Sequence, residues 1–94
     1  MRVDLPAAWD PWKALINRRK HGVSFHEAAT AFGDPFALVL DDEVHSIVER
    51  RAILIGCSTR GRLLVVVHVD QGDTVRILSA RRPTAAERRT YEEA

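Results

Sequence analysis

The chain has 94 residues, of which 46% are hydrophobic, so it can build one small core and we expect a single domain over residues 1–94. Its one cysteine, Cys57, excludes an internal disulfide, and no group of cysteines and histidines has the spacing of zinc ligands. The sequence contains neither the apolar region of a signal peptide nor the roughly 20 apolar residues that span a bilayer. We therefore expect a cytoplasmic protein that binds no metal, cofactor or membrane.

The net charge of +1 conceals an asymmetry between the two halves of the chain. Residues 1–49 carry five basic and eight acidic side chains, whereas residues 50–94 carry nine arginines and five acids, which gives net charges of −3 and +4. Twelve of the fourteen basic residues are arginines, whose planar guanidinium binds phosphate or carboxylate through two hydrogen bonds. The composition therefore favours a phosphate-bearing ligand or an acidic protein as partner.

A helix is predicted close to the N-terminus. Asp10 followed by Pro11 is typical of a helix start. The apolar residues that follow recur at helical spacing and are Trp12, Leu15 and Ile16. We expect the helix to run to about Lys20, because Gly22 then supplies the left-handed cap that ends many helices.

Capping-box patterns predict two further helices. Residues 24–27 read SFHE and open a helix over residues 25–32, whereas residues 84–87 read TAAE and open a C-terminal helix. A short apolar strand is expected over residues 36–40, where the second helix has ended.

The middle of the chain predicts three strands, over residues 49–57, 62–70 and 74–81, joined by short loops that contain glycine. With the helices, these strands indicate an α+β fold. We expect a small antiparallel sheet of about four strands, two N-terminal helices and one C-terminal helix.

Side-chain alternation predicts which face of this sheet is covered. In the strand over residues 62–70 one face is entirely apolar: Leu63, Val65, Val67 and Val69. We expect the helices to cover that face. His68 would then lie on the open face, together with Arg76 of the next strand.

Several charged residues are candidates for function. Arg76 lies in the middle of a strand that otherwise reads as core, where an arginine is uncommon unless it is paired or faces a ligand. His21 and Lys20 end the first helix, where they either complement the helix dipole or take part in chemistry. Glu49 and Arg51 point to the same side of one strand, either as an exposed charge pair or as site residues.

The remaining charges are weaker candidates. Arg81 and Arg82 follow a strand and form either a solvated cationic end or a phosphate contact. Arg88 and Arg89 fit a solvated helix face. Three adjacent acids at residues 41–43 lack the spacing of a calcium loop and indicate no metal, while His26 and His45 are expected at the surface.

Together, these motifs resemble the BrnT family of toxins over nearly the whole chain. The resemblance rests on the following residues in order: Trp9-Asp10, Asn17, Lys20-His21-Gly22-Val23-Ser24-Phe25, Glu27-Ala28, Glu49, Arg51, Ile55-Gly56, Gly61-Arg62, Val65, Arg76-Ile77, Ser79-Ala80-Arg81-Arg82, Glu87 and Tyr91. Each motif alone is weak, whereas all of them at matching separations are specific.

The resemblance implies a fold similar to the RelE-type ribonucleases and an activity that degrades RNA without a metal and so inhibits translation and growth. It also implies a BrnA-type ribbon-helix-helix antitoxin, which neutralises the toxin and represses the shared promoter as a complex. Two departures stand out. Residues 3–8 replace a usual short strand, which leaves open whether a strand precedes Trp9, and Ala52 stands where an aromatic residue is common.

A mechanism that fits both the residues and the resemblance is attack of the RNA 2′-hydroxyl on the neighbouring phosphate, which yields a cyclic phosphate. This reaction needs proton transfer and cations around the developing charge. Arg51 and Arg76 are assigned to the phosphate and the transition state, and either His21 or Glu49 to proton transfer. The residues assigned to RNA binding are Lys20, Arg81, Arg82 and Tyr91.

A non-enzymatic module remains the alternative. In that case the cationic face would only bind the antitoxin or nucleic acid within a repressor complex. Fold alone does not separate the two. Arg76 favours the enzyme, because a pure interaction surface does not require an arginine in mid-strand.

Overall fold

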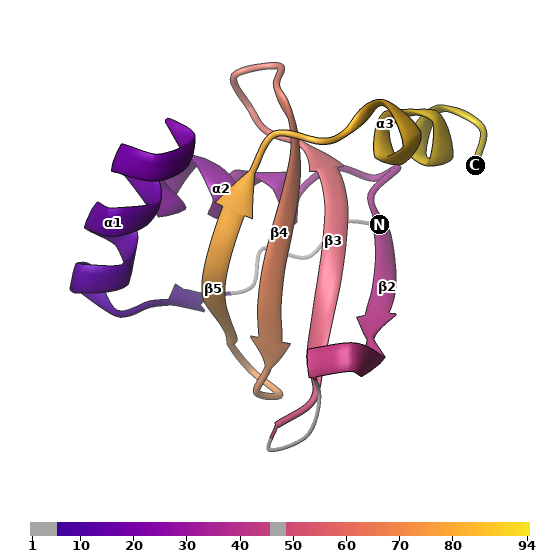
Figure 1. Cartoon of the computed structure of the whole chain (residues 1–94). Helices are drawn as coiled ribbons and strands as arrows, with labels where there is room; N and C mark the ends of the chain where they lie inside the picture. The colour runs from indigo at the N-terminus through magenta and orange to yellow at the C-terminus, as the bar shows by residue number, and fades with distance from the viewer. Residues whose placement is uncertain (1–5, 46–48) are drawn as a thin grey trace.

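The computed structural model describes residues 6–45 and 49–94, which form a five-stranded sheet with helices around it (Figure 1). The elements are β1 (Ala7–Ala8), α1 (Pro11–His21), α2 (Phe25–Ala31), β2 (Leu38–Asp42), the short 3-10 helix η1 (Glu43–His45), β3 (Arg51–Cys57), β4 (Leu63–Asp70), β5 (Val75–Arg81) and α3 (Ala85–Glu92). The strand order is β1-β5-β4-β3-β2, and β1 alone among these strands pairs in parallel.

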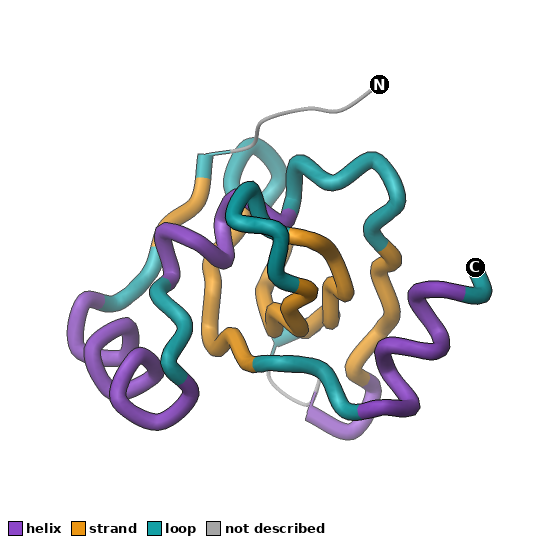
Figure 2. The backbone as a smooth tube through the Cα atoms, turned by 90° about the horizontal axis from the view of Figure 1, so that it is seen from above, coloured by secondary structure: helices purple, strands orange, loops and turns teal. Residues whose placement is uncertain are grey.

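The predicted α+β class, with two N-terminal helices and one C-terminal helix, is confirmed. The sheet has one strand more than predicted in the described part of the chain, because Ala7 and Ala8 pair with Val75 and Arg76 at the β5 edge. Seen from above, α1 and α3 lie at opposite sides of the molecule with the strands between them (Figure 2).

The helix ends follow the local signals in the sequence. The Asp10 carboxylate accepts a hydrogen bond of 2.8 Å from the backbone N–H of Trp12, and Gly22 takes the left-handed conformation with φ 70°. At the start of α3, Thr84 and Glu87 form the complete capping box.

Only half of the predicted capping box forms at α2. Ser24 Oγ accepts from the Glu27 N–H at 3.1 Å, but the Glu27 carboxylate turns away from the helix start. It accepts hydrogen bonds from Arg62, with Nε at 2.9 Å, and from Ser58 Oγ at 2.7 Å. Arg62 therefore lowers the pKa of Glu27 to about 2. The guanidinium of Arg62, the residue just before β4, binds this carboxylate more strongly than a single backbone N–H does.

The main core lies where α2 packs behind β3, β4 and β5 (Figure 1). Its buried members are Val23, Phe25, Ala28, Ala31, Leu54, Leu64, Val66, Ile77 and Ala80. α2 therefore covers the face of β4 that carries Leu64 and Val66, and the prediction that the helices cover the Val65 and Val67 face was wrong for the two N-terminal helices. Alternation could not separate the two faces, because both are apolar along most of β4.

A close approach of α2 to the sheet requires a glycine. A Cβ on Gly56 would lie 2.9 Å from the Ala31 carbonyl oxygen and 3.1 Å from Ala37 Cβ. A larger residue in β3 would push α2 away from the core.

α1 is fastened to the sheet by a polar residue. Asn17 is buried, and its Nδ2 donates to the carbonyls of Val23 at 3.0 Å and Ala80 at 2.8 Å. Its Oδ1 accepts from the Ala80 N–H at 3.0 Å. Asn17 thus satisfies backbone groups of β5 and of the α1–α2 connection at once. The apolar residues whose spacing predicts α1 lie on its exposed side instead.

α3 covers only part of the other sheet face. Tyr91 packs against a small cluster formed by Ile55, Leu63 and Val65. Its hydroxyl donates to Asp34 Oδ2 at 2.6 Å, which helps to raise the pKa of Tyr91 to about 12. Among the described residues no helix covers the rest of this face, which is called the open face below (Figure 1). None of the helices in the described ranges is long and apolar enough to cross a membrane.

Candidate active site

A β-bulge shapes the open face. Val67 of β4 pairs with Ser79 of β5, but the next residue, His68, pairs with Ile77. Leu78 is therefore an extra residue in β5, and it lines the open face beside Ser79.

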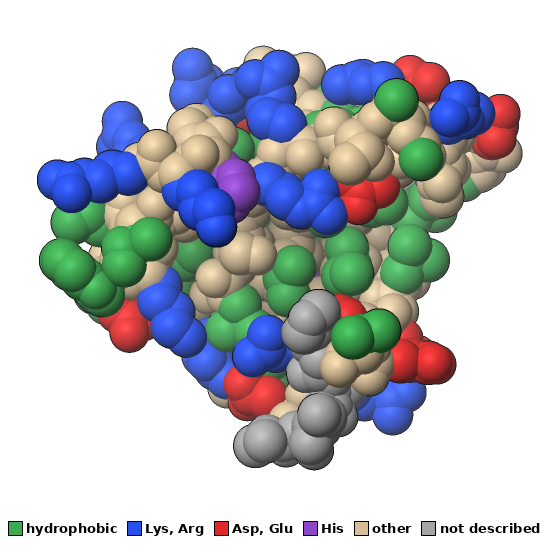
Figure 3. Space-filling view, viewed as in Figure 1, with side chains coloured by type: hydrophobic (Ala, Val, Ile, Leu, Met, Phe, Trp, Pro, Cys, Tyr) green, Lys and Arg blue, Asp and Glu red, His purple; other side chains and the backbone are tan. Residues whose placement is uncertain are grey.

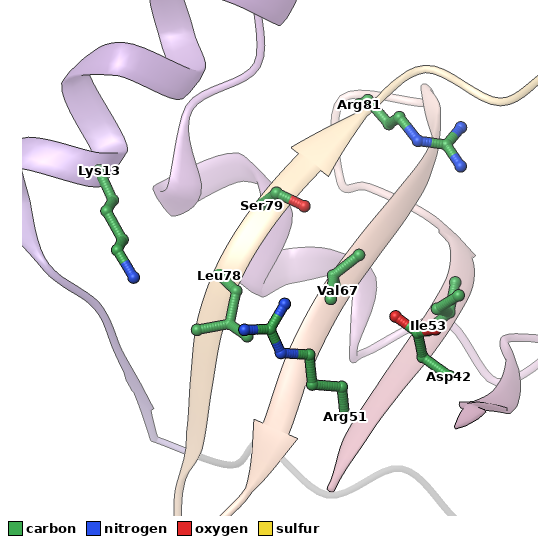
Figure 4. A pocket seen from close by; sticks show the side chains of 8 residues that line it. All are labelled: Lys13, Asp42, Arg51, Ile53, Val67, Leu78, Ser79 and Arg81. Atoms are coloured by element: carbon green, nitrogen blue, oxygen red, sulfur yellow. The ribbon is translucent and has the colours of Figure 1, made fainter. Parts of the chain in front are cut away.

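The open face contains a hollow of about 450 Å³ (Figure 4). It is lined by Lys13, Asp42, Arg51, Ile53, Val67, Leu78, Ser79 and Arg81. The apolar members belong to the strands. Lys13 reaches in from α1, and the Arg51 guanidinium extends across the strands toward β5 (Figure 4). A hollow of this size with cations around an apolar floor suits a nucleotide, whose base is flat and whose phosphate is charged.

Arg76 and Glu49 form an ion pair near the start of β5. Arg76 Nη2 donates to Glu49 Oε1 and Oε2, both at 2.6 Å. Arg76 pairs with Val69 in the β4–β5 register, which places it on the open face. Its side chain keeps 31% of its surface exposed, and that of Glu49 keeps 40%. The pair is therefore accessible to a ligand in the described structure.

His68 does not share the open face with Arg76, contrary to the prediction. It is buried on the helix-covered face, with its ring centroid 4.8 Å from that of Phe32 in an edge-to-face contact. Burial lowers the pKa of His68. His68 pairs with Ile77 and Val69 pairs with Arg76, so alternation directs His68 and Arg76 to opposite faces, and the sequence alone does not give this register.

Arg81 marks the opposite end of β5. Its Nη1 and Nη2 each donate to the Glu87 carboxylate at 2.8 Å, which lowers the pKa of Glu87 to about 2. The contact joins β5 to the first turn of α3. Arg82, the next residue, is exposed.

His21 lies at this same end of β5. It follows Asn17 by one helical turn on the same face of α1, and Asn17 binds Ala80. Its side chain is half-buried, whereas Lys20 is exposed. Blue cationic side chains gather along this upper edge, from α1 past the end of β5 to α3 (Figure 3).

The four side chains predicted to act in catalysis do not form one cluster. Arg76 and Glu49 contact each other, and Arg51 lines the hollow. His21 lies toward Arg81, which follows Arg76 by five residues along β5, or roughly 15 Å at the usual rise per strand residue. The described contacts therefore group Glu49 with Arg76 and place His21 toward the other end of β5.

The sequence did not indicate three polar residues of the hollow, which are Lys13, Asp42 and Ser79. In α1, Lys13, Asn17 and His21 follow one another at intervals of four residues and therefore lie on one face of the helix. The signal in the sequence was Asn17, a polar residue within the helical pattern, which marks the face of α1 that turns toward β5. Asp42 pairs with Arg51 in the β2–β3 register, and Ser79 depends on the bulge, so neither could be placed without the sheet register.

Across the described residues, no group of three or more His, Cys, Asp or Glu side chains is placed to hold a metal ion.

A family model described as "Ribonuclease toxin, BrnT, of type II toxin-antitoxin system" matches residues 9–87. The chain belongs to this BrnT family. The matched range includes every residue that lines the hollow. The chain also resembles the crystal structure of the Brucella abortus ribonuclease toxin BrnT, with a TM-score of 0.66 and 20% identity over 85% of this chain and 97% of that one. No functionally curated protein matches the sequence. The predicted BrnT family and the α+β fold class are thus confirmed.

Proposed function

We propose that the chain is an RNA-cleaving toxin and that RNA is cleaved in the hollow of the open face. The observation that carries this proposal is the convergence of Lys13, Arg51 and Arg81 around an apolar floor, with Arg76 nearby on the same face. Cations fixed in place before the substrate binds stabilise a phosphorane-like transition state effectively, because they need little reorganisation. Membership of a ribonuclease toxin family supports the same conclusion.

The proposed reaction is metal-independent attack of the 2′-hydroxyl on the adjacent phosphate. The 2′ oxygen forms a bond to phosphorus as the bond to the 5′ oxygen breaks, leaving a 2′,3′-cyclic phosphate and a 5′-hydroxyl. Arg51 and Arg76 neutralise the charge that develops on the phosphate oxygens. Their cations supply the stabilisation that a divalent ion would otherwise give.

The arrangement of the side chains favours Glu49 over His21 as the base. Glu49 already contacts Arg76, so a phosphate drawn to Arg76 brings its 2′-hydroxyl close to this carboxylate. His21, Lys20, Arg81 and Arg82 at the other end of β5 then bind the flanking nucleotides. Tyr91, whose ring and hydroxyl are used in packing, supports this end of the site by fixing α3.

The proposed partner is a BrnA-type antitoxin with a ribbon-helix-helix domain, expressed from a neighbouring gene. Its acidic segment would cover the cations of the open face and exclude RNA. The DNA-binding domain would direct the complex to its own promoter. The type II toxin-antitoxin description of the family supports a protein partner.

The test is incubation of the purified protein with RNA in EDTA, followed by analysis of the product ends. We expect cleavage that leaves 2′,3′-cyclic phosphates, and growth arrest when the protein is expressed alone. Intact RNA together with normal growth would contradict the toxin. Intact RNA together with a stable antitoxin complex and promoter binding would support the non-enzymatic module instead.

A further inference from the structure

The outer face of α1 exposes a strip of large apolar side chains. Trp12 is 65% exposed, Leu15 44% and Ile16 46%. Hydrophobic side chains gather at the left edge of the molecule over α1 (Figure 3). This apolar strip, defined by Trp12, Leu15 and Ile16, lies outside the hollow described above.

Other residues of α1 make its described contacts with the sheet and the core. α1 is fastened through Asn17, and Ala14 packs against the main core. A helix on a globular protein normally turns its apolar stripe inward and its polar residues outward. α1 buries its asparagine and leaves its tryptophan in solvent, and exposed apolar patches of this kind mark interaction sites.

Cations surround the strip on both sides. An α-helix has about 3.6 residues per turn, which places Lys13 and Lys20 along one edge of the strip, beside Ile16. Arg18 lies along the other edge, beyond Leu15. Arg19 lies at the C-terminal end of the strip, in line with Trp12. All of these side chains are exposed, and the described side-chain contacts include none of Arg18, Arg19 and Lys20. Pro11–His21 contains no acidic residue. A partner complementary to this surface would carry a row of apolar side chains with carboxylates along both of its edges.

We propose that the apolar strip is the docking site for an amphipathic helix of the antitoxin, whose apolar seam packs on Trp12, Leu15 and Ile16 and whose flanking acids pair with Lys20, Arg18 and Arg19. The inference rests on the antitoxin of the proposed function and adds where that partner is held. A protein helix is favoured over RNA because Leu15 and Ile16 are aliphatic and offer no face on which a base stacks.

Docking here places the partner next to the active site. Lys13 belongs to α1 and also lines the hollow. A helix that lies along the strip therefore passes beside the hollow, and the chain that leaves this helix can continue over the open face. The strip would supply affinity through apolar burial, while the acidic segment over the hollow would block RNA.

The test compares two variants in complex formation with the product of the neighbouring gene. Trp12→Gln with Leu15→Gln removes the strip while keeping good helix formers. Val39→Gln is the matched control, because Val39 is 61% exposed on β2. We expect the double variant to weaken the complex by roughly 30-fold or more, the scale of a lost hot spot. The control should stay within about 3-fold of the parent, and both variants should cleave RNA as the parent does.

Each outcome has a distinct meaning. Equal affinity of parent and double variant would overturn the docking site while leaving the toxin intact. A parent that forms a dimer, and a double variant that is a monomer, would make the strip an interface between two copies of this chain. A rise in KM for RNA without weaker antitoxin binding would make it an RNA surface. A parent that cleaves RNA but forms no complex would contradict both the antitoxin and the strip.

Discussion

Two pairs of a glutamate and an arginine show how one combination of residues serves different ends in this molecule. Glu27 and Arg62 lie against the core, with 3% and 26% of their side chains exposed, whereas Glu49 and Arg76 flank the open face with 40% and 31% exposed. Glu27 also accepts from Ser58, so its carboxylate is fully used by the protein. Glu49 and Arg76 contact each other at the surface, where a ligand can replace the contact.

The difference follows from solvation. A charge taken out of water requires permanent partners, and losing one of them leaves the other uncompensated. A pair at the surface contributes little to folding and is easily exchanged, which suits a site that must accept a phosphate. Burial, rather than residue type, therefore separates the structural pair from the proposed catalytic pair.

Removal of the two glutamates one at a time tests whether burial separates the two pairs. We expect Glu27→Ala to lower the free energy of unfolding by about 3 kcal/mol, because Arg62 loses its buried partner. Glu49→Ala should lower it by less than about 1 kcal/mol. Urea denaturation measures both. Similar losses in the two variants would mean that burial does not distinguish the pairs.

The arginine of the exposed pair is expected to act on the reaction. Arg76→Ala should reduce RNA cleavage by roughly 100-fold, as expected when one preorganised cation is removed, while the melting temperature stays near that of the parent. Arg88→Ala on α3, also an exposed arginine, is the control and should cleave normally. If activity falls only in proportion to stability, Arg76 is a structural residue.

Acid should lower the stability of the fold through the buried pair. Arg62 holds the pKa of Glu27 at about 2, below its ordinary value of 4.5. The stability from this carboxylate is complete above pH 4.5 and is lost as the pH falls toward 2. We expect the protein to lose about 2 kcal/mol through Glu27 between pH 6 and pH 3. Glu27→Gln should show a shallower decline, and an unchanged slope would assign the acid sensitivity to other groups.

The smallest expected effect concerns α3. Tyr91→Phe removes the hydroxyl that donates to Asp34 at 2.6 Å, and we expect a loss of about 1 kcal/mol in unfolding free energy. Thr90→Ala removes an exposed hydroxyl from the same helix and should cost less. If Tyr91→Phe instead impairs cleavage at unchanged stability, Tyr91 contacts RNA.

Local signals were the part of the fold that the sequence predicted well. Asp10, Gly22 and Thr84 act within a few residues of where they stand, and the helix ends they predict are present. The second half of the α2 capping box was wrong because Arg62, 35 residues away, competes for Glu27. Such a competitor is invisible to any pattern confined to neighbouring residues.

The candidate site was less predictable, because it depends on register and on which sheet face is covered. Arg51, Arg76 and Arg81 were selected from unusual positions or residue type, and the structure places them on the open face. Lys13 was missed because nothing in the sequence indicates that α1 turns its apolar side outward and its asparagine toward β5.

The extra residue in β5 decides to which side of the sheet Arg76 and Arg81 point. Arg76 and Arg81 are separated by an odd number of positions, so a regular strand would direct one to each side of the sheet. Leu78 shifts the count by one, and the two arginines pair with Val69 and Val65, which share a side. The same sequence paired as a regular strand, without the bulge at Leu78, would preserve every cation and still divide the two arginines between two surfaces. The cationic character of the open face therefore depends on the bulge in β5 as much as on the arginines themselves.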